Sequence, residues 1–316
     1  MQRHRYGLVA RLVAVLAGFA LLTAACGDDD GDGASGTTDA PGTSSADGSG
    51  DGAACDSVTI GWIPWDEDIA VSYLWAHLLE EQGIDVELTQ VDVAPVFQGV
   101  AQGDLDLFLD TWLPVTHEVY WEEYGDSVED LGSWYDQATL NIAVPTYVDA
   151  ESIADLAGRA AEFDNRIVGI EAGAGLMRVT RDEVIPTYGL EDFTLVESST
   201  TAMLAELERA IREEAPIVVT LWHPHWAYAA YDIKDLTDTE GVMGGAEEIH
   251  TIARSGFSDD CPEVAGWLSN FQLDDATLAS LEDVVFNEYD TGEEATAVEA
   301  WLEDEANRAV VDAWIG

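Results

Sequence analysis

The stretch that decides the fold class is residues 58–109, VTIGWIPWDEDIAVSYLWAHLLEEQGIDVELTQVDVAPVFQGVAQGDLDLFL. Short apolar runs rich in β-branched residues alternate there with longer helical patterns. The apolar runs are 58–63, 86–91 and 105–109, and the helical patterns are 66–82 and 93–102. Gly83 and Gly103 stand where a helix C-terminus favours glycine. This order predicts a parallel sheet with right-handed crossovers.

A second set of the same kind follows a separate apolar stretch at 140–144. Its expected strands are 167–170, 193–196 and 217–221, and its expected helices are 176–188 and 200–214. Residues 262–315 predict several helices and no strand. Two α/β units without a flexible linker between them predict two lobes that face each other across a cleft.

Charge excludes several classes of function. The chain of 316 residues has 12 Lys or Arg and 63 Asp or Glu, which gives a net charge of −51. Nucleic-acid binding needs a basic footprint, so we predict no nucleic-acid partner. Lys234 is the only lysine, which excludes a phosphate-binding G-x-x-x-x-G-K-[ST] loop. Most of the acidic excess is expected to be solvated surface, and it indicates a salty habitat in which repulsion is screened.

The N-terminus has the layout of an export signal. Arg3, Arg5 and Arg11 precede the apolar run 12–22, which is too short to span a bilayer stably. Small residues and then Cys26 follow, an arrangement that resembles a bacterial lipobox, so we predict a signal peptide at 1–26 and a lipid on Cys26. The alternative is an ordinary cleavage site followed by an unmodified cysteine. Residues 27–54 contain no large apolar side chain and predict a disordered acidic tether.

Two further cysteines, Cys55 and Cys261, complete the set of three. In an exported protein a remaining pair favours a disulfide, which would join the start of the folded part to its C-terminal third. Two free buried thiols are the alternative.

Three tryptophans share one kind of position, because each falls at or just after the end of an expected strand. They are Trp65, Trp112 and Trp222. Ligands of open α/β sheets bind outside the carboxyl ends of the strands, so the three indoles are expected to converge on one site. Core filling is the alternative for any one of them. Aromatic faces attract a cation whose charge is spread over methyl groups, so the predicted guest is a quaternary ammonium.

A glycine-rich turn supplies the complementary anion site. Residues 169–177, GIEAGAGLM, run from an expected strand into an expected helix and present free backbone N–H groups. His117, five residues after Trp112, is expected to donate to the same anion, unless it caps the following helix or lies on the surface. A dinucleotide site is the weaker alternative, because Arg178 stands where its third glycine belongs.

Catalytic and metal signatures are weak. His223 and His225 form an H-x-H pair, but spacing marks no third ligand. There is no G-x-S-x-G elbow and no other specific catalytic constellation. We therefore predict no enzyme activity, no metal and no cofactor, and keep an extracellular metal-dependent hydrolase and a purely structural cell-surface protein as the alternatives from other classes.

Several blocks in order give the chain a specific resemblance over nearly all of residues 57–316. The blocks are PWDEDIA, GDLDLFLDTWLPVTHE, GIEAGAGLM, VESSTTAM, VTLWHPHWAYAAYDIKDL and EEIHTIARSGF. With them the chain resembles the substrate-binding lipoprotein of a glycine betaine (compatible-solute) ABC transporter.

The resemblance implies a two-lobed periplasmic-binding-protein-like α/β fold of type II with the ligand cleft between the lobes. Lobe I would comprise 55–143 and 250–316, and lobe II 144–249. By analogy, Trp65, Trp112 and Trp222 form the ammonium cage, while Gly175, Leu176 and His117 hold the carboxylate. The implied protein is a monomeric extracytoplasmic receptor, anchored to the membrane by its lipid, that delivers glycine betaine to an ABC permease for osmoprotectant uptake.

The chain departs from the family at the third tryptophan, where it has Leu221-Trp222-His223 instead of G-W-T. A reshaped pocket wall leaves proline betaine, carnitine, choline or a sulfonium analogue as alternative ligands. The intact anion site argues against choline, which has no carboxylate.

Overall fold

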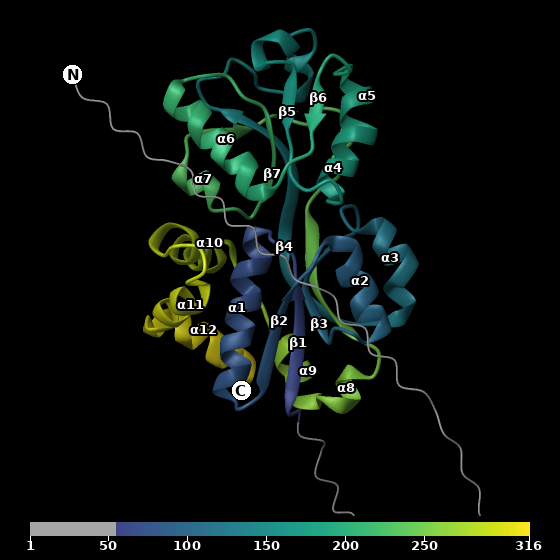
Figure 1. Ribbon diagram of the computed structural model, residues 1–316, viewed down its shortest axis with the longest axis vertical. Coiled ribbons are helices and arrows are strands. Elements are labelled where there is room, and N and C mark those ends of the chain that lie inside the picture. The colour runs from purple at the N-terminus through teal and green to yellow at the C-terminus, as the bar shows by residue number, and fades with distance from the viewer. Residues whose placement is uncertain (1–54) are drawn as a thin grey trace, which may run out of the picture. The chain divides into compact units, whose positions relative to one another are not determined.

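The computed structural model describes residues 55–316. Within them, strands form one curled sheet in the order β2-β1-β3-β9-β4-β7-β5-β6, with β8 paired to β4 (Figure 1). The strands are β1 (Ser57–Trp62), β2 (Asp85–Gln90), β3 (Leu107–Leu113), β4 (Val128–Pro145), β5 (Arg166–Val168), β6 (Thr194–Val196), β7 (Val219–His223), β8 (Ile233–Asp235) and β9 (Glu247–Arg254).

The helices are α1 (Asp66–Glu81), α2 (Val93–Gln102), α3 (Glu118–Tyr124), α4 (Gly175–Val179), α5 (Ile185–Tyr188), α6 (Thr200–Glu213), α7 (Ala227–Ala230), α8 (Phe257–Asp260), α9 (Pro262–Ser269), α10 (Asp275–Asp283), α11 (Glu294–Leu302) and α12 (Glu305–Ile315). Within residues 55–316, no helix is long and apolar enough to cross a membrane.

The first predicted unit is confirmed. β1 pairs in parallel with both β2 and β3, and α1 and α2 connect them. Gly83 and Gly103 have φ values of +83° and +77°, the left-handed backbone that favours glycine directly after a helix.

The second predicted unit is also confirmed. β5 pairs in parallel with β6 and β7, and α6 connects the last two. The expected helix 176–188 is present as α4 and α5, which a π-helical turn at Thr180–Val184 joins. The C-terminal tail is helical as expected, from α9 to α12.

The sheet as a whole is mixed, because β4 and β9 add antiparallel pairs at its centre to the predicted parallel ones. β9 pairs with β3 and β4, and β4 continues past it to pair with β7. The sequence analysis marked only 140–144 of β4, as an apolar stretch, and it missed β9. Bulges interrupt their register at three places, and each shifts the alternation of inward and outward side chains that marks a strand.

The course of β4 defines two lobes. Residues up to Ala138 pair with β9 beside β1 and β3, whereas residues from Thr139 pair with β7. Figure 1 shows β4 running through both halves of the described chain, with α1, α2 and α10 to α12 around one half and α4 to α6 around the other. The lobe boundaries expected at 143/144 and 249/250 stay predictions.

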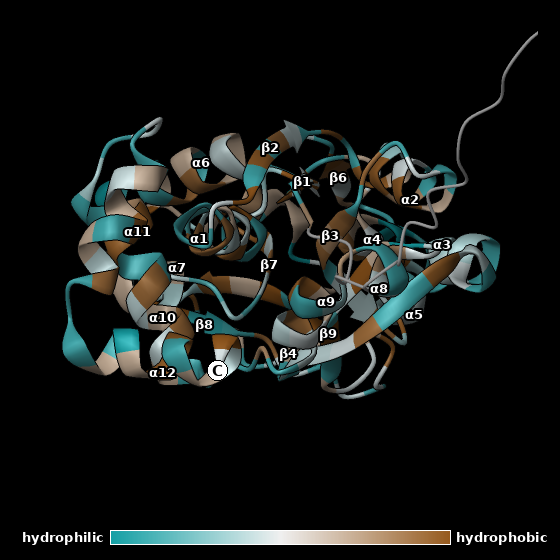
Figure 2. Cartoon of the chain, turned by 90° about the horizontal axis from the view of Figure 1, so that it is seen from below, coloured by the Kyte–Doolittle hydropathy of each residue, from teal (hydrophilic) through white to brown (hydrophobic). Residues whose placement is uncertain are grey.

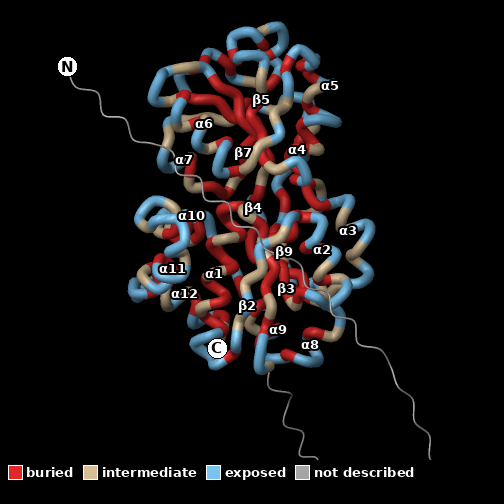
Figure 3. Tube along the Cα trace, in the orientation of Figure 1, coloured by how far each residue is buried: buried red, intermediate tan, exposed pale blue. Residues whose placement is uncertain are grey.

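Burial follows the strands. Buried residues run along β3, β4 and β9, and exposed residues lie on the outer turns of the helices (Figure 3). Figure 2 shows the matching hydropathy, with hydrophobic residues on the central strands and hydrophilic ones on outer helices such as α3. The cores of both lobes therefore lie between the sheet and the helices that cover it.

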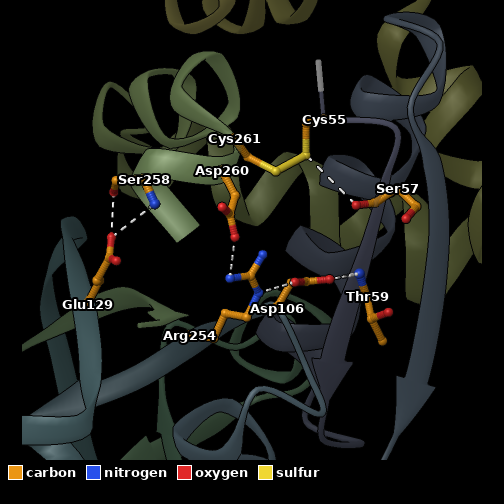
Figure 4. The surroundings of a disulfide bond; sticks show 9 residues. All are labelled: Cys55, Ser57, Thr59, Asp106, Glu129, Arg254, Ser258, Asp260 and Cys261. Atoms are coloured by element: carbon orange, nitrogen blue, oxygen red, sulfur yellow. Dashed lines mark hydrogen bonds and ion pairs between the residues drawn. A yellow bond between two sulfur atoms is a disulfide. The ribbon is translucent and has the colours of Figure 1, made fainter. Parts of the chain in front are cut away.

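Cys55 and Cys261 form a disulfide in the structure, with an S–S distance of 2.04 Å. Figure 4 shows it beside a short ionic network, in which Arg254 bonds Asp106 at 2.7 Å and Asp260 at 2.8 Å. Asp106 also accepts from the backbone N–H of Thr59, at 2.7 Å. The start of β1 is thus held against α8 and α9. The signal peptide, Cys26 and the tether lie outside the described residues.

Candidate ligand-binding site

A small cavity lies between the two lobes at the carboxyl ends of β1 and β3. The cavity is small, so it suits a small molecule. The residues that line it are Trp65, Glu67, Trp112, Thr116, Leu140, Ile170, Ala174, Gly175, Leu176 and Trp222.

The three tryptophans that sequence analysis singled out all line this cavity. Trp65 follows β1 and precedes the first turn of α1, Trp112 lies in β3, and Trp222 lies in β7 opposite Leu140. Each is at most 5% exposed. Three segments distant in the sequence therefore bring their indoles to one chamber.

Each indole N–H in this set donates to a carboxylate. Trp112 donates to Asp110 at 2.7 Å, and Trp222 donates to Glu67 at 2.8 Å. Trp65 donates to Glu171 at 3.3 Å. Because the polar atom of each ring already has a partner, the rings offer the cavity their aromatic carbon surface, the part of an indole that attracts a cation.

Gly175 and Leu176 open α4 and line the same cavity as the tryptophans. Their N–H groups are the first two of the helix and have no acceptor within it, so they carry its positive end. A Cβ on Gly175 would lie 2.0 Å from the carbonyl oxygen of Thr116, so the close approach of the two lobes requires glycine here.

His117 lies beside the cavity and is not one of its lining residues. Its ring is fully buried and stacks on Trp65, with centroids 5.7 Å apart. Nδ1 accepts from the backbone N–H of Trp112 at 2.9 Å, and Nε2 has no partner. Burial lowers the pKa of His117 to about 3, so the ring is neutral and its proton sits on Nε2. One unpaired N–H donor therefore lies next to the tryptophans.

Contacts around the cavity hold the lobes together. Arg178 of α4 donates to the carbonyl oxygen of Val115 at 2.7 Å, and the Tyr120 hydroxyl donates to that of Gly173 at 3.3 Å. Glu247 in β9 fixes the facing loop, because it accepts from the backbone N–H groups of Val115 and Thr116 at 2.7 and 2.8 Å.

Sequence reasoning missed several residues of this site, namely Glu67, Asp110, Thr116, Glu171, Arg178 and Glu247. The only signal in the sequence was proximity to the tryptophans. Glu67 belongs to the acidic run directly after Trp65, and Asp110 lies two residues before Trp112. Acids in the first turn of a helix normally indicate a solvated terminus, so the run carried no indication of burial.

His223 and His225, the pair considered as metal ligands, each contact a different carboxylate. His223 Nε2 lies 2.9 Å from Asp235, and His225 Nε2 lies 3.2 Å from Asp66. Among residues 55–316, no group of three histidine, cysteine or acidic side chains could hold a metal ion.

Residues 56–304 match the family model described as the substrate binding domain of an ABC-type glycine betaine transport system. The chain belongs to this family. It is 38% identical over 149 residues to the glycine betaine/carnitine transport binding protein of Listeria monocytogenes, a match that covers 46% of this chain and 48% of the relative. The alignment thus spans about half the length of that relative.

Two solved structures confirm the two-lobed fold with its ligand cleft. Lactococcal OpuAC in its closed form with glycine betaine is 33% identical, with a TM-score of 0.77, over 83% of this chain and 100% of that one. A choline-binding protein in complex with choline is 26% identical, with a TM-score of 0.74, over 83% of this chain and 99% of that one. The predicted family is therefore confirmed.

Proposed function

We propose that this protein is an extracytoplasmic receptor that binds glycine betaine, or a related quaternary ammonium zwitterion, and delivers it to an ABC permease. The observation that carries the proposal is the meeting of Trp65, Trp112 and Trp222 around one small cavity that the start of α4 also lines. The family match supports the same conclusion. The three tryptophans enclose the trimethylammonium head, and the backbone N–H groups of Gly175 and Leu176 hold the carboxylate.

The two ends of the ligand need different chemistry, and the cavity provides both. A desolvated aromatic face contributes about 2 kcal/mol to binding a cation, so three faces supply several kcal/mol before the cost of ordering. Hydrogen bonds to a charged acceptor each contribute about 2 kcal/mol, and the unpaired Nε2–H of His117, beside the cavity, is the proposed third donor. We expect an affinity near micromolar, about −8 kcal/mol, which permits both capture and release.

Trp112→Ala is expected to weaken glycine betaine binding more than tenfold, because it removes one face of the cage. Calorimetry on the purified receptor measures the loss. Trp267→Ala is the matched control, since Trp267 lines the groove beside the disulfide and not the cage. A Trp112→Ala protein that melts like the wild type and binds with unchanged affinity would remove Trp112 from the site.

The anion half of the cavity predicts which onium compounds bind. Choline has the same head but no carboxylate, so it leaves the N–H groups of Gly175 and Leu176 without a charged acceptor. We expect choline to bind at least tenfold more weakly than glycine betaine. Thermal shift and calorimetry with glycine betaine, proline betaine, carnitine, choline and a sulfonium analogue test the order, and choline binding as tightly as glycine betaine would contradict it.

We propose that the receptor is held at the cell membrane by a lipid on Cys26 and works as a monomer. The basic and apolar pattern of 1–26 supports export, and the composition of 27–54 supports a flexible tether of roughly 30 Å. The chain has a single lysine, which agrees with an acidic surface and with a zwitterionic ligand whose binding needs no basic side chain.

We propose no catalytic role. The family is one of substrate-binding proteins of a transport system, and the tryptophans, N–H donors and glycines of the cavity suit reversible binding. A hydrolase working through His223 and His225 would need both rings at one centre, whereas each contacts a different carboxylate.

A further inference from the structure

Two tryptophans of the cage share an unusual support, a pair of buried carboxyl groups that accept from their indole N–H groups. Glu67 of α1 accepts from Trp222 at 2.8 Å, and Asp110 of β3 accepts from Trp112 at 2.7 Å. Glu67 also lines the cavity itself. The cage and the carboxyl pair are therefore one connected unit, although their residues come from three separate elements.

This pair has no cationic partner. Glu67 is 1% exposed and Asp110 is fully buried, and Asp110 Oδ2 has no hydrogen-bond partner at all. None of the ion pairs within residues 55–316 includes either side chain. A buried carboxylate without a cation is strongly disfavoured, so each group is driven toward its protonated form.

The pKa values follow this environment. Burial raises the pKa of Asp110 to about 7. Burial also raises the pKa of Glu67 well above its usual range, and the neighbouring Asp110 and Glu282 raise it further. The hydrogen bonds from the tryptophans only partly oppose these shifts.

The other titratable and charged groups near the pair are mostly acids. They are Asp66 and Asp68 of α1, Glu282 of α10, Glu171 on the opposite lobe, His117, His225 and Arg178. Burial lowers the pKa values of His117 and His225 to about 3, so both rings stay neutral above pH 5. The guanidinium of Arg178 is bonded to the carbonyl of Val115. The groups that can change charge beside the cage near neutral pH are therefore carboxyls.

We propose that Glu67 and Asp110 determine the preference for a cationic head: the pair holds a proton in the ligand-free receptor and releases it when an onium group enters the cage. The inference rests on the proposed function. On binding, the O–H bond of one carboxyl breaks, its electron pair stays on the oxygen, and the proton passes to the buffer. The carboxylate then faces a cation that cannot donate a hydrogen bond and that replaces the proton as its counter-charge.

The sign of the pH dependence follows from this exchange. A neighbouring cation lowers the carboxyl pKa in the complex, so between the bound and the free pKa binding releases a proton. Affinity must then rise with pH, by up to about tenfold per unit where a full proton is released. Because burial raises the pKa of Asp110 to about 7, we expect the rise of affinity with pH to be measurable on the acid side of neutrality.

Calorimetry with glycine betaine in phosphate and in bis-Tris, two buffers that work near pH 6 and have different ionisation enthalpies, counts the protons released. At pH 6 we expect about one per ligand bound. The probe for comparison is 3,3-dimethylbutanoate, which has a tert-butyl group in place of trimethylammonium. We expect it to bind the wild-type receptor at least tenfold more weakly and without proton release.

Glu67→Gln and Asp110→Asn keep an oxygen that accepts from Trp222 and Trp112 but cannot ionise. In the double variant we expect no proton release, an affinity independent of pH, and a reduced preference for glycine betaine over 3,3-dimethylbutanoate. Glu197→Gln is the matched control, because it removes one exposed acid outside the cavity and should keep the wild-type release.

Equal binding enthalpies in the two buffers and a constant Kd from pH 5.5 to 7.5 would overturn the proposal for the wild-type receptor, with no variant needed. Proton release that persists in a folded double variant would overturn it as well. Failure of glycine betaine to bind at any pH would instead reject the proposed function.

Discussion

Replacing Cys55 and Cys261 by serine is expected to lower the free energy of unfolding by about 5 kcal/mol. The disulfide closes a loop with a sequence separation of 206, and the chain-entropy cost of opening such a loop rises with its length. Equilibrium denaturation in urea, with and without reductant, measures the change. Since native domains are stable by only 5–15 kcal/mol, a loss of this size removes much of the total.

Two comparisons separate the loss of the disulfide from any other effect of the two serine substitutions. Reductant should lower the stability of the wild type to that of the double serine variant and leave the variant itself unchanged. Betaine affinity should stay within about twofold at temperatures where both fold, because β1 places roughly 20 Å between the disulfide and Trp65. A wild-type protein whose urea midpoint is insensitive to reductant would contradict the prediction.

The positions of Trp65 and Trp112 could be predicted because they depend on local pattern alone. The alternation of apolar runs and helices from residue 58 to 109 fixes where β1 and β3 end, and parallel strands bring their ends to one edge. Trp65 and Trp112 therefore had to lie near each other. Trp222 required the further assumption that the second unit faces the first.

The central strands could not be predicted, since their pattern is broken where they matter most. β4 passes from one half of the sheet to the other after bulges that follow Asp130, Ser133 and Tyr135, and each bulge shifts the side-chain alternation. The strand that links the lobes is thus the one whose periodicity is least regular.

The carboxyl pair that accepts from the cage tryptophans was hidden for a different reason. Glu67 belongs to a first helical turn, where acids are common and usually solvated, and only packing against β3 and α10 buries it. His117 was identified by spacing, but its tautomer depends on a hydrogen bond from Trp112 that spacing cannot show. Burial and proton position are properties of the folded arrangement.

Gly175→Ala is expected to weaken glycine betaine binding at least a hundredfold, roughly 3 kcal/mol. The new Cβ would lie 2.0 Å from the oxygen and 2.7 Å from the carbon of the Thr116 carbonyl, and both atoms belong to the backbone of the opposite lobe. That loop cannot move aside easily, because Glu247 bonds two of its N–H groups. The lobes therefore cannot reach the arrangement in which the tryptophans and the start of α4 enclose the ligand together.

The variant should fold normally, because alanine has a higher helix propensity than glycine. The φ of Gly175 is also not in the left-handed region, so a Cβ there causes no backbone strain. Gly173→Ala in the same turn is the matched control. Its Cβ would meet only Cγ1 of Val93, at 3.2 Å, so we expect a loss below tenfold. Small-angle scattering should show the wild type becoming more compact with betaine and Gly175→Ala remaining extended. Tight binding by Gly175→Ala would mean that the ligand does not require the close contact between Thr116 and α4, and closure would then have to be explained by other contacts between the lobes.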